Sequence, residues 1–258
     1  MPSGNQEEYG SPVDMHRPYP IPKRPWVMHQ TWNDILLAHW PIPVKELQAI
    51  VPVYLPLDTY EGQAWVSIVP CWMSGVRPRF MPSIPYLSQF PQINLRTYVT
   101  LDGKPGVYFF SLDADQSIMV ELARLSFHLP YFRTTIQYKS DEQHHVSYYS
   151  VRRDSRANSA QFQATYRPID DVNISDPGSL EYWLTERYCL YSIDKKGRVY
   201  RGEIDHCRWP LQPAEAEIEI NSFFSSFGIQ VPQSKPLFHF AKRLHVHAWL
   251  LEACLLGN

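Results

Sequence analysis

The residues of this sequence best suited to chemistry are arginines that lie within strongly apolar segments. Five of them stand beside Trp, Tyr, Phe and Leu: Arg77, Arg79, Arg96, Arg124 and Arg187. Arginine is rarely buried without a partner, and its planar guanidinium binds a carboxylate through two parallel hydrogen bonds. Structural ion pairs are one interpretation, with Asp113, Glu121, Glu181 or Glu186 as partners. The other is a pocket that binds a small carboxylate.

One predicted strand places several of these groups together. Side chains alternate between the two faces of a strand, so Asn94, Arg96 and Tyr98 share one face, and Ile93 and Leu95 lie on the other. The polar face is either exposed to solvent or forms the wall of a pocket. The pocket interpretation predicts a substrate-binding set of Arg77, Arg96, Tyr98, Asp113, Arg124 and Arg187.

Two residues could carry a proton in such a pocket. Tyr131 follows a Leu-Pro pair, and His39 shares a strand face with Ile35 and Leu37. A tyrosine takes part in proton transfer only if nearby cations lower its pKa well below its usual value of about 10. A histidine between Ile and Leu is more typical of a hydrophobic core than of a general base.

Other kinds of site lack their sequence patterns. His245 and His247 place two imidazoles on one strand face, but a catalytic zinc needs three protein ligands. The sequence has no G-x-S-x-G motif for a nucleophilic serine and no glycine-rich phosphate loop. We therefore expect no metal and no cofactor.

Length and charge restrict the class of protein. The 258 residues carry a net charge of −2, which favours neither nucleic acid nor an anionic membrane as a partner. Four widely spaced cysteines in a chain long enough to form its own core indicate a reduced, cytoplasmic protein. No apolar run approaches the roughly 20 residues of a membrane-spanning helix. Self-association into a homo-oligomer stays open.

The elements that would position these residues are mostly strands. Asp102-Gly103 is a strong hairpin signal and joins strands expected over 92–101 and 106–113. Asp113 or Asp115 is expected to cap a following helix. Short turns join most of the predicted strands, which indicates a mainly antiparallel α+β domain over residues 26–258. Residues 1–25 are polar and proline-rich, and we expect a disordered or loosely docked arm.

Several motifs resemble one known family, the YqjF-like proteins, in order and spacing from about Trp26 to Leu251. They are Ala38–Pro41, Leu57–Thr59, Val76–Arg79, Asn94–Tyr98, Gly106–Asp113, Leu129–Tyr131, Leu184–Tyr188 and Trp209–Gln212. The resemblance implies a fold similar to that of acetoacetate decarboxylase, a cone-like barrel or strongly curved sheet with a few short helices around a small pocket for acidic substrates.

Comparison with the same family argues against one catalytic mechanism. Acetoacetate decarboxylase uses a Schiff-base lysine, and the corresponding place here, Phe127–Phe132, offers Tyr131 instead of an amine. Lys104 and Lys139, the nearest lysines, are poorly placed for a buried pocket. Three hypotheses follow. The first is a pocket that binds a small carboxylate or similar anion. The second is a lyase- or hydrolase-like enzyme on a keto acid that uses Tyr131 or His39. The third is a non-catalytic module that binds another protein.

Overall fold

The computed structural model describes residues 16–230 and 232–255. Within them the chain forms twelve strands and four short helices. Their bounds are β1 Met28–Ile42, α1 Val44–Gln48, β2 Ala64–Pro78, β3 Phe90–Leu101, β4 Lys104–Ala114, α2 Ser117–Phe127, β5 Tyr131–Ser140, β6 Val146–Arg152, β7 Gln161–Pro168, α3 Leu180–Thr185, β8 Cys189–Ile193, β9 Val199–Asp205, β10 Gln212–Asn221, α4 Phe223–Ser226, β11 Leu237–Ala248 and β12 Glu252–Ala253.

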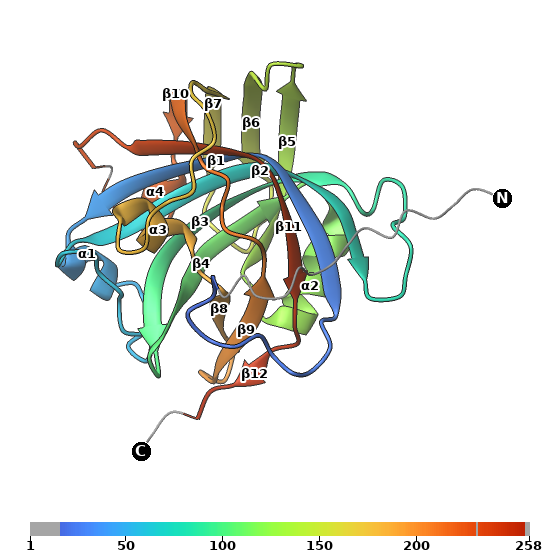
Figure 1. Cartoon of the computed structure of the whole chain (residues 1–258), viewed down its shortest axis with the longest axis vertical. Helices are drawn as coiled ribbons and strands as arrows, with labels where there is room; N and C mark the ends of the chain where they lie inside the picture. The colour runs from blue at the N-terminus through green and yellow to red at the C-terminus, as the bar shows by residue number, and fades with distance from the viewer. Residues whose placement is uncertain (1–15, 231, 256–258) are drawn as a thin grey trace.

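The strands form one continuous sheet that closes twice. Five neighbouring strands, in the order β4-β3-β2-β1-β11, are shared by both closures. On one side the order continues through β10, β7, β6 and β5, and β5 pairs with β4 to complete a nine-stranded barrel. On the other side β8 pairs with β4, and β9 pairs with both β8 and β11. This second closure is a smaller ring of seven strands. In Figure 1, β5, β6 and β7 lie above the shared strands, and β8 and β9 lie below.

The shared strands are apolar on both faces because each face packs into a different barrel. On β2, Val66 and Ile68 belong to one buried cluster, whereas Val69, Cys71 and Met73 belong to another. The first cluster also contains Tyr148 and Phe162 of the nine-stranded barrel, and the second contains Ile204 and Trp209 near β9. These long, continuously buried strands therefore separate two cores.

The predicted fold class is confirmed: the chain is α+β and mainly antiparallel, with a strongly curved sheet and few helices. Asp102 and Gly103 have φ values of +52° and +71° and join β3 to β4, as in a tight hairpin turn. Pairing between β4 and β5 and between β4 and β8 is parallel. These two parallel contacts close the two barrels.

The predicted cap of α2 is wrong. Gln116 occupies the cap position, and no side chain there hydrogen-bonds the first turn. Asp113 cannot serve, because it ends in a buried ion pair within β4 (below), and Asp115 is exposed. Ile118, in the first turn of α2, is 56% exposed.

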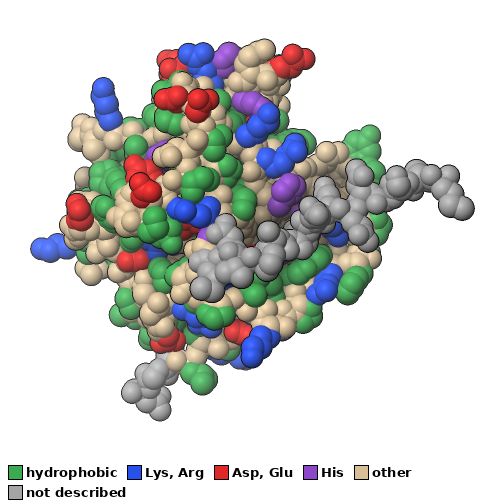
Figure 2. Space-filling view, in the orientation of Figure 1, with side chains coloured by type: hydrophobic (Ala, Val, Ile, Leu, Met, Phe, Trp, Pro, Cys, Tyr) green, Lys and Arg blue, Asp and Glu red, His purple; other side chains and the backbone are tan. Residues whose placement is uncertain are grey.

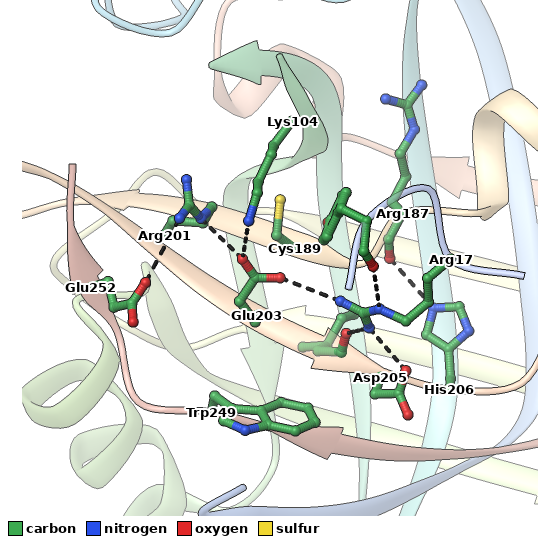
Figure 3. A network of polar contacts seen from close by, with 12 residues as sticks. Arg17, Lys104, Arg187, Cys189, Arg201, Glu203, Asp205, His206, Trp249 and Glu252 are labelled. Atoms are coloured by element: carbon green, nitrogen blue, oxygen red, sulfur yellow. Dashed lines mark hydrogen bonds and ion pairs between the residues drawn. The ribbon is translucent and has the colours of Figure 1, made fainter. Parts of the chain in front are cut away.

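Much of the proline-rich arm, residues 1–15, lies outside the described residues. From His16 onward the chain lies against β9 (Figure 3). Arg17 donates to the carbonyl oxygen of Ile204 at 2.6 Å and to Asp205 at 2.9 Å, and it pairs with Glu203 at 3.4 Å. Lys104 and Arg201 approach Glu203 at 3.0 and 3.1 Å, so three cations surround one buried carboxylate.

On the face seen in Figure 2, basic and acidic side chains are interspersed, so neither sign of charge predominates. The loop between β2 and β3 is the most apolar exposed segment, with Phe80 88% and Tyr86 84% exposed. Among the helices of residues 16–230 and 232–255, none is long and apolar enough to cross a membrane.

Candidate functional site

The second barrel contains a cavity of about 120 Å³. Its walls come from β1, β2, β3, β4, the end of α2 and start of β5, the segments flanking β8 and β9, and β11. Most lining side chains are apolar. Among the described residues, no aspartate, glutamate or lysine lines this cavity, and the charged side chains that do are Arg96 and Arg187. The cavity is therefore apolar with a local excess of positive charge.

Strand β3 supplies one wall, as the alternation of its residues predicts. Phe90, Gln92, Asn94 and Arg96 succeed one another every second residue and line the cavity, since alternate side chains of a strand share a face. Tyr98 continues this row beyond the cavity. Its hydroxyl lies 2.6 Å from Ser67 Oγ, and its ring is 4.8 Å from that of Trp183.

Arg96 is buried without a hydrogen-bond or ion-pair partner among the described residues, and its guanidinium lies 6.0 Å from the centre of the Tyr98 ring. Its residue is 6% exposed, its Nε has no hydrogen-bond partner, and none of the ion pairs or hydrogen bonds among the described residues involves its guanidinium. Burial of a charge without compensation costs several kcal/mol. Among the described residues, the Arg96 guanidinium therefore has no carboxylate to balance its charge.

Arg187 is anchored but retains bonding capacity. Its Nη1 pairs with Asp58 at 2.5 Å, and its Nε donates to the carbonyl oxygen of Trp183 at 2.6 Å. The guanidinium lies 4.4 Å from the Trp183 ring and 5.1 Å from the Tyr98 ring, where cation–π attraction adds to its fixation. Its Nη2 is buried and has no hydrogen-bond partner. Arg187 is therefore a rigid donor at the cavity wall.

Tyr131 lines the cavity and donates to Gln92 Oε1 at 3.0 Å. Burial, aided by the nearby Cys71, raises the pKa of the phenol above its ordinary value. A raised pKa keeps the hydroxyl protonated, so Tyr131 can donate a hydrogen bond but is a poor base. Asn94 adds an amide oxygen that is buried without a donor.

His39 lies outside the lining of the cavity. It is fully buried, its Nδ1 is 2.6 Å from Ser67 Oγ, and its Nε2 has no partner. Burial and the neighbouring charges of His239 and Arg96 hold the pKa of His39 well below its ordinary value. Arg96 also opposes the effect of burial on Cys71, whose thiol has a pKa raised to about 12.

The remaining predicted binding residues lie away from the cavity. Asp113 accepts from Arg152 in the first barrel at 2.6 and 2.9 Å. Arg124 donates to the carbonyl oxygen of Tyr131 at 2.6 Å. Arg77 is paired in register with His29 on the neighbouring strand. The structure thus brings Arg96, Arg187 and Tyr131 together and places Tyr98 just beyond them.

The sequence analysis did not identify the residues that form the opposite wall of the cavity. Trp32 and Trp209 line the cavity with ring centroids 6.0 Å apart. His206 also lines it, with its Nε2 3.4 Å from the carbonyl oxygen of Arg187, and burial lowers its pKa. These residues come from opposite ends of the chain. The available signal was Trp209–Gln212, one of the motifs shared with the YqjF-like proteins.

The doubly closed, strongly curved sheet is that of a protein of acetoacetate decarboxylase-like fold. The DUF2071 family model, described as "Uncharacterized conserved protein", matches residues 29–245, and the chain belongs to this family. It is 47% identical over 232 residues to the "Uncharacterized protein YqjF" of Bacillus subtilis (strain 168), covering 90% of this chain and 94% of that protein.

Solved structures confirm the fold. The enduracididine biosynthesis enzyme MppR complexed with pyruvate superimposes with a TM-score of 0.64 at 10% identity, covering 91% of this chain and 93% of that chain. An acetoacetate decarboxylase-like enzyme from Sphingomonas wittichii RW1 gives 0.62 at 11%, with coverage of 91% and 95%. Acetoacetate decarboxylase from Legionella pneumophila gives 0.58 at 13%, with 93% of each chain covered.

Proposed function

We propose that this protein binds a small carboxylate or similar anion in the cavity of its second barrel, with Arg96 as the principal charged contact and Arg187 as a second donor. The observation that carries this proposal is the unpartnered guanidinium of Arg96 in an apolar cavity without acidic side chains. A carboxylate placed there would accept a bidentate hydrogen bond and neutralise the buried charge.

The fold supports the proposal in a limited way. One structure of this fold, that of MppR, holds pyruvate, a small carboxylate. A Schiff-base mechanism finds no support, because none of the described residues lining the cavity is a lysine. The raised pKa of Tyr131 and the position of His39 outside the cavity favour binding over proton transfer. Tyr131, whose hydroxyl donates to Gln92, would then serve as part of the cavity wall.

The decisive experiment uses Arg96→Met. This substitution should abolish carboxylate binding measured by isothermal titration calorimetry. It should also raise the thermal midpoint of the unliganded protein, because it removes a buried charge without breaking any bond among the described residues. We expect a gain of about 1–2 kcal/mol in the free energy of unfolding, which amounts to a few degrees in a chain of this size.

Loss of carboxylate affinity together with a gain in stability would identify Arg96 as a ligand-binding arginine rather than a structural one. A structural arginine would lower the midpoint when it is replaced. The matched control is Arg243→Met, which makes the same substitution at an exposed position of β11 and should change neither quantity appreciably. Wild-type protein that binds no carboxylate, or Arg96→Met protein that binds as wild type does, would refute the proposal.

A further inference from the structure

We infer that the cavity selects a monocarboxylate of about four to seven carbons in all, with a compact or linear hydrocarbon body, and that it disfavours very short acids such as acetate. This inference rests on the proposed function and deepens it. It arises from the arrangement of polarity along β3, together with the volume of the cavity.

Polarity changes in one direction along the cavity. Arg96 lies at one end of the β3 row, next to Arg187, and Phe90 lies at the other end, paired in register with Met73. Phe90 stands six positions before Arg96, which is about 20 Å between Cα atoms in a strand. A ligand whose carboxylate meets Arg96 therefore extends its remaining atoms toward Phe90.

The end beyond Gln92 offers a lining for hydrocarbon. Met73 is 2% exposed and faces Trp32 in the register of β1 and β2. Val76, at the end of β2, also lines the cavity, and Phe127 and Leu129 enter from the end of α2. Acetate at Arg96 would leave this apolar surface uncovered, whereas a longer acid would remove it from water at a gain for each methylene.

The volume sets the upper limit. An engineered protein cavity of about 150 Å³ accommodates benzene. A cavity of about 120 Å³ therefore accepts a body of comparable size, on the order of six to nine non-hydrogen atoms including the carboxylate. Longer fatty acids would have to displace close-packed walls, and repacking a protein interior is costly.

A homologous series tests the inference on the wild-type protein. Calorimetric titration with acetate, butyrate, hexanoate, octanoate and decanoate should show an affinity that rises about fourfold per methylene up to hexanoate and no longer rises at octanoate. The affinity should then fall for decanoate. Hexanamide has nearly the same shape without the charge, and we expect it to bind at least tenfold more weakly than hexanoate.

A variant at the apolar end adds an independent measurement. Cys71→Leu should narrow the cavity where β2 pairs with Gln92 and reduce the affinity for hexanoate by a larger factor than the affinity for acetate. If the variant does not fold, the chain-length series on the wild-type protein still decides. Equal affinity across that series would overturn this inference and leave the proposed function standing. Failure of every carboxylate to bind would overturn both.

Discussion

Asp113 and Arg152 form a fully buried, bidentate ion pair, with Nε–Oδ1 at 2.6 Å and Nη2–Oδ2 at 2.9 Å. Thr134 adds a third hydrogen bond to the carboxylate, and Arg152 reaches Ser111 and the carbonyl oxygen of Asn158 as well. The first barrel thus contains a fully satisfied arginine. Arg96, on the other side of the shared sheet, is also buried but has no carboxylate partner among the described residues. This contrast separates a structural charge from a charge available to a ligand.

The Asp113–Arg152 pair makes a large contribution to stability. Asp113→Ala leaves the Arg152 guanidinium buried and uncompensated, and we expect a loss of about 3–5 kcal/mol in the free energy of unfolding. Urea denaturation measures this loss. The control is Glu215→Ala, which breaks the exposed pair with Arg167 and should cost less than about 1 kcal/mol. Equal effects of the two substitutions would show that the buried pair has no special role.

Asp113 also illustrates what sequence could and could not predict. Alternation along β3 correctly placed Asn94, Arg96 and Tyr98 on one face, because strand periodicity is a local property. The partner of Asp113 is Arg152, 39 residues away, and no spacing rule identifies such a pair. Asp113 was therefore included among the predicted ligand contacts and helix caps, although it lies in the first barrel.

The segment that begins at His16 should hold to β9 mainly through Arg17. Arg17→Ala removes its contacts with Glu203, Asp205 and the carbonyl oxygen of Ile204. We expect faster amide hydrogen exchange around residues 16–20, where Arg17 makes three contacts with β9, whereas Arg24 keeps its own contacts with Glu252 and Trp249. Lys23→Ala, at an exposed position, is the matched control. If amide hydrogen exchange is unchanged in Arg17→Ala, other contacts hold this segment against β9.

Buried histidines should make the protein less stable in mild acid. Burial lowers the pKa of His39 and of His206 in the folded state, below the ordinary value of 6.5. As the pH falls through about 6.5, these histidines bind protons in the unfolded chain but not in the folded chain. The free energy of unfolding therefore decreases with decreasing pH. Each such histidine contributes about 1.4 kcal/mol per pH unit until its folded-state pKa is reached.

The histidine His39 offers a direct measurement of this dependence. Urea denaturation of the wild-type protein and of His39→Gln, at several values between pH 7.5 and 5, gives the two slopes. Below pH 6, the slope of the free energy of unfolding against pH should be smaller in the variant by the equivalent of one proton. Parallel curves for the two proteins would contradict the assignment of a neutral, buried imidazole at position 39.

Closure of the second barrel should depend on the absence of a side chain at Gly106. A Cβ there would lie 2.7 Å from Cys189 Sγ and 2.8 Å from the carbonyl oxygen of Cys189, where β4 pairs with β8 through Val107 and Tyr108. Gly106→Ala should cost about 1–3 kcal/mol through overpacking, and a thermal unfolding scan measures the loss. A midpoint equal to that of the wild type would show that β8 moves aside freely.

The second barrel also marks the limit of sequence reasoning about the site. Hairpin signals and apolar strands predicted most elements, and the motifs shared with the YqjF-like proteins predicted the fold. The cavity, however, joins Trp32 of β1 to His206 and Trp209 after β9, and these residues meet only because β9 bridges β8 and β11. Arg77 and Arg124 were plausible by composition, but their strand and helix positions direct them elsewhere.

The most direct test of the account is a crystal structure with 6-bromohexanoate, whose bromine gives an anomalous signal. The account predicts the carboxylate within hydrogen-bonding distance of the Arg96 guanidinium and the bromine displaced from it in the direction of Gln92 and Phe90, with no such density in Arg96→Met crystals. A ligand bound with its carboxylate away from Arg96, or density at the same place in the variant, would contradict the claim that this unpartnered arginine is the anion site.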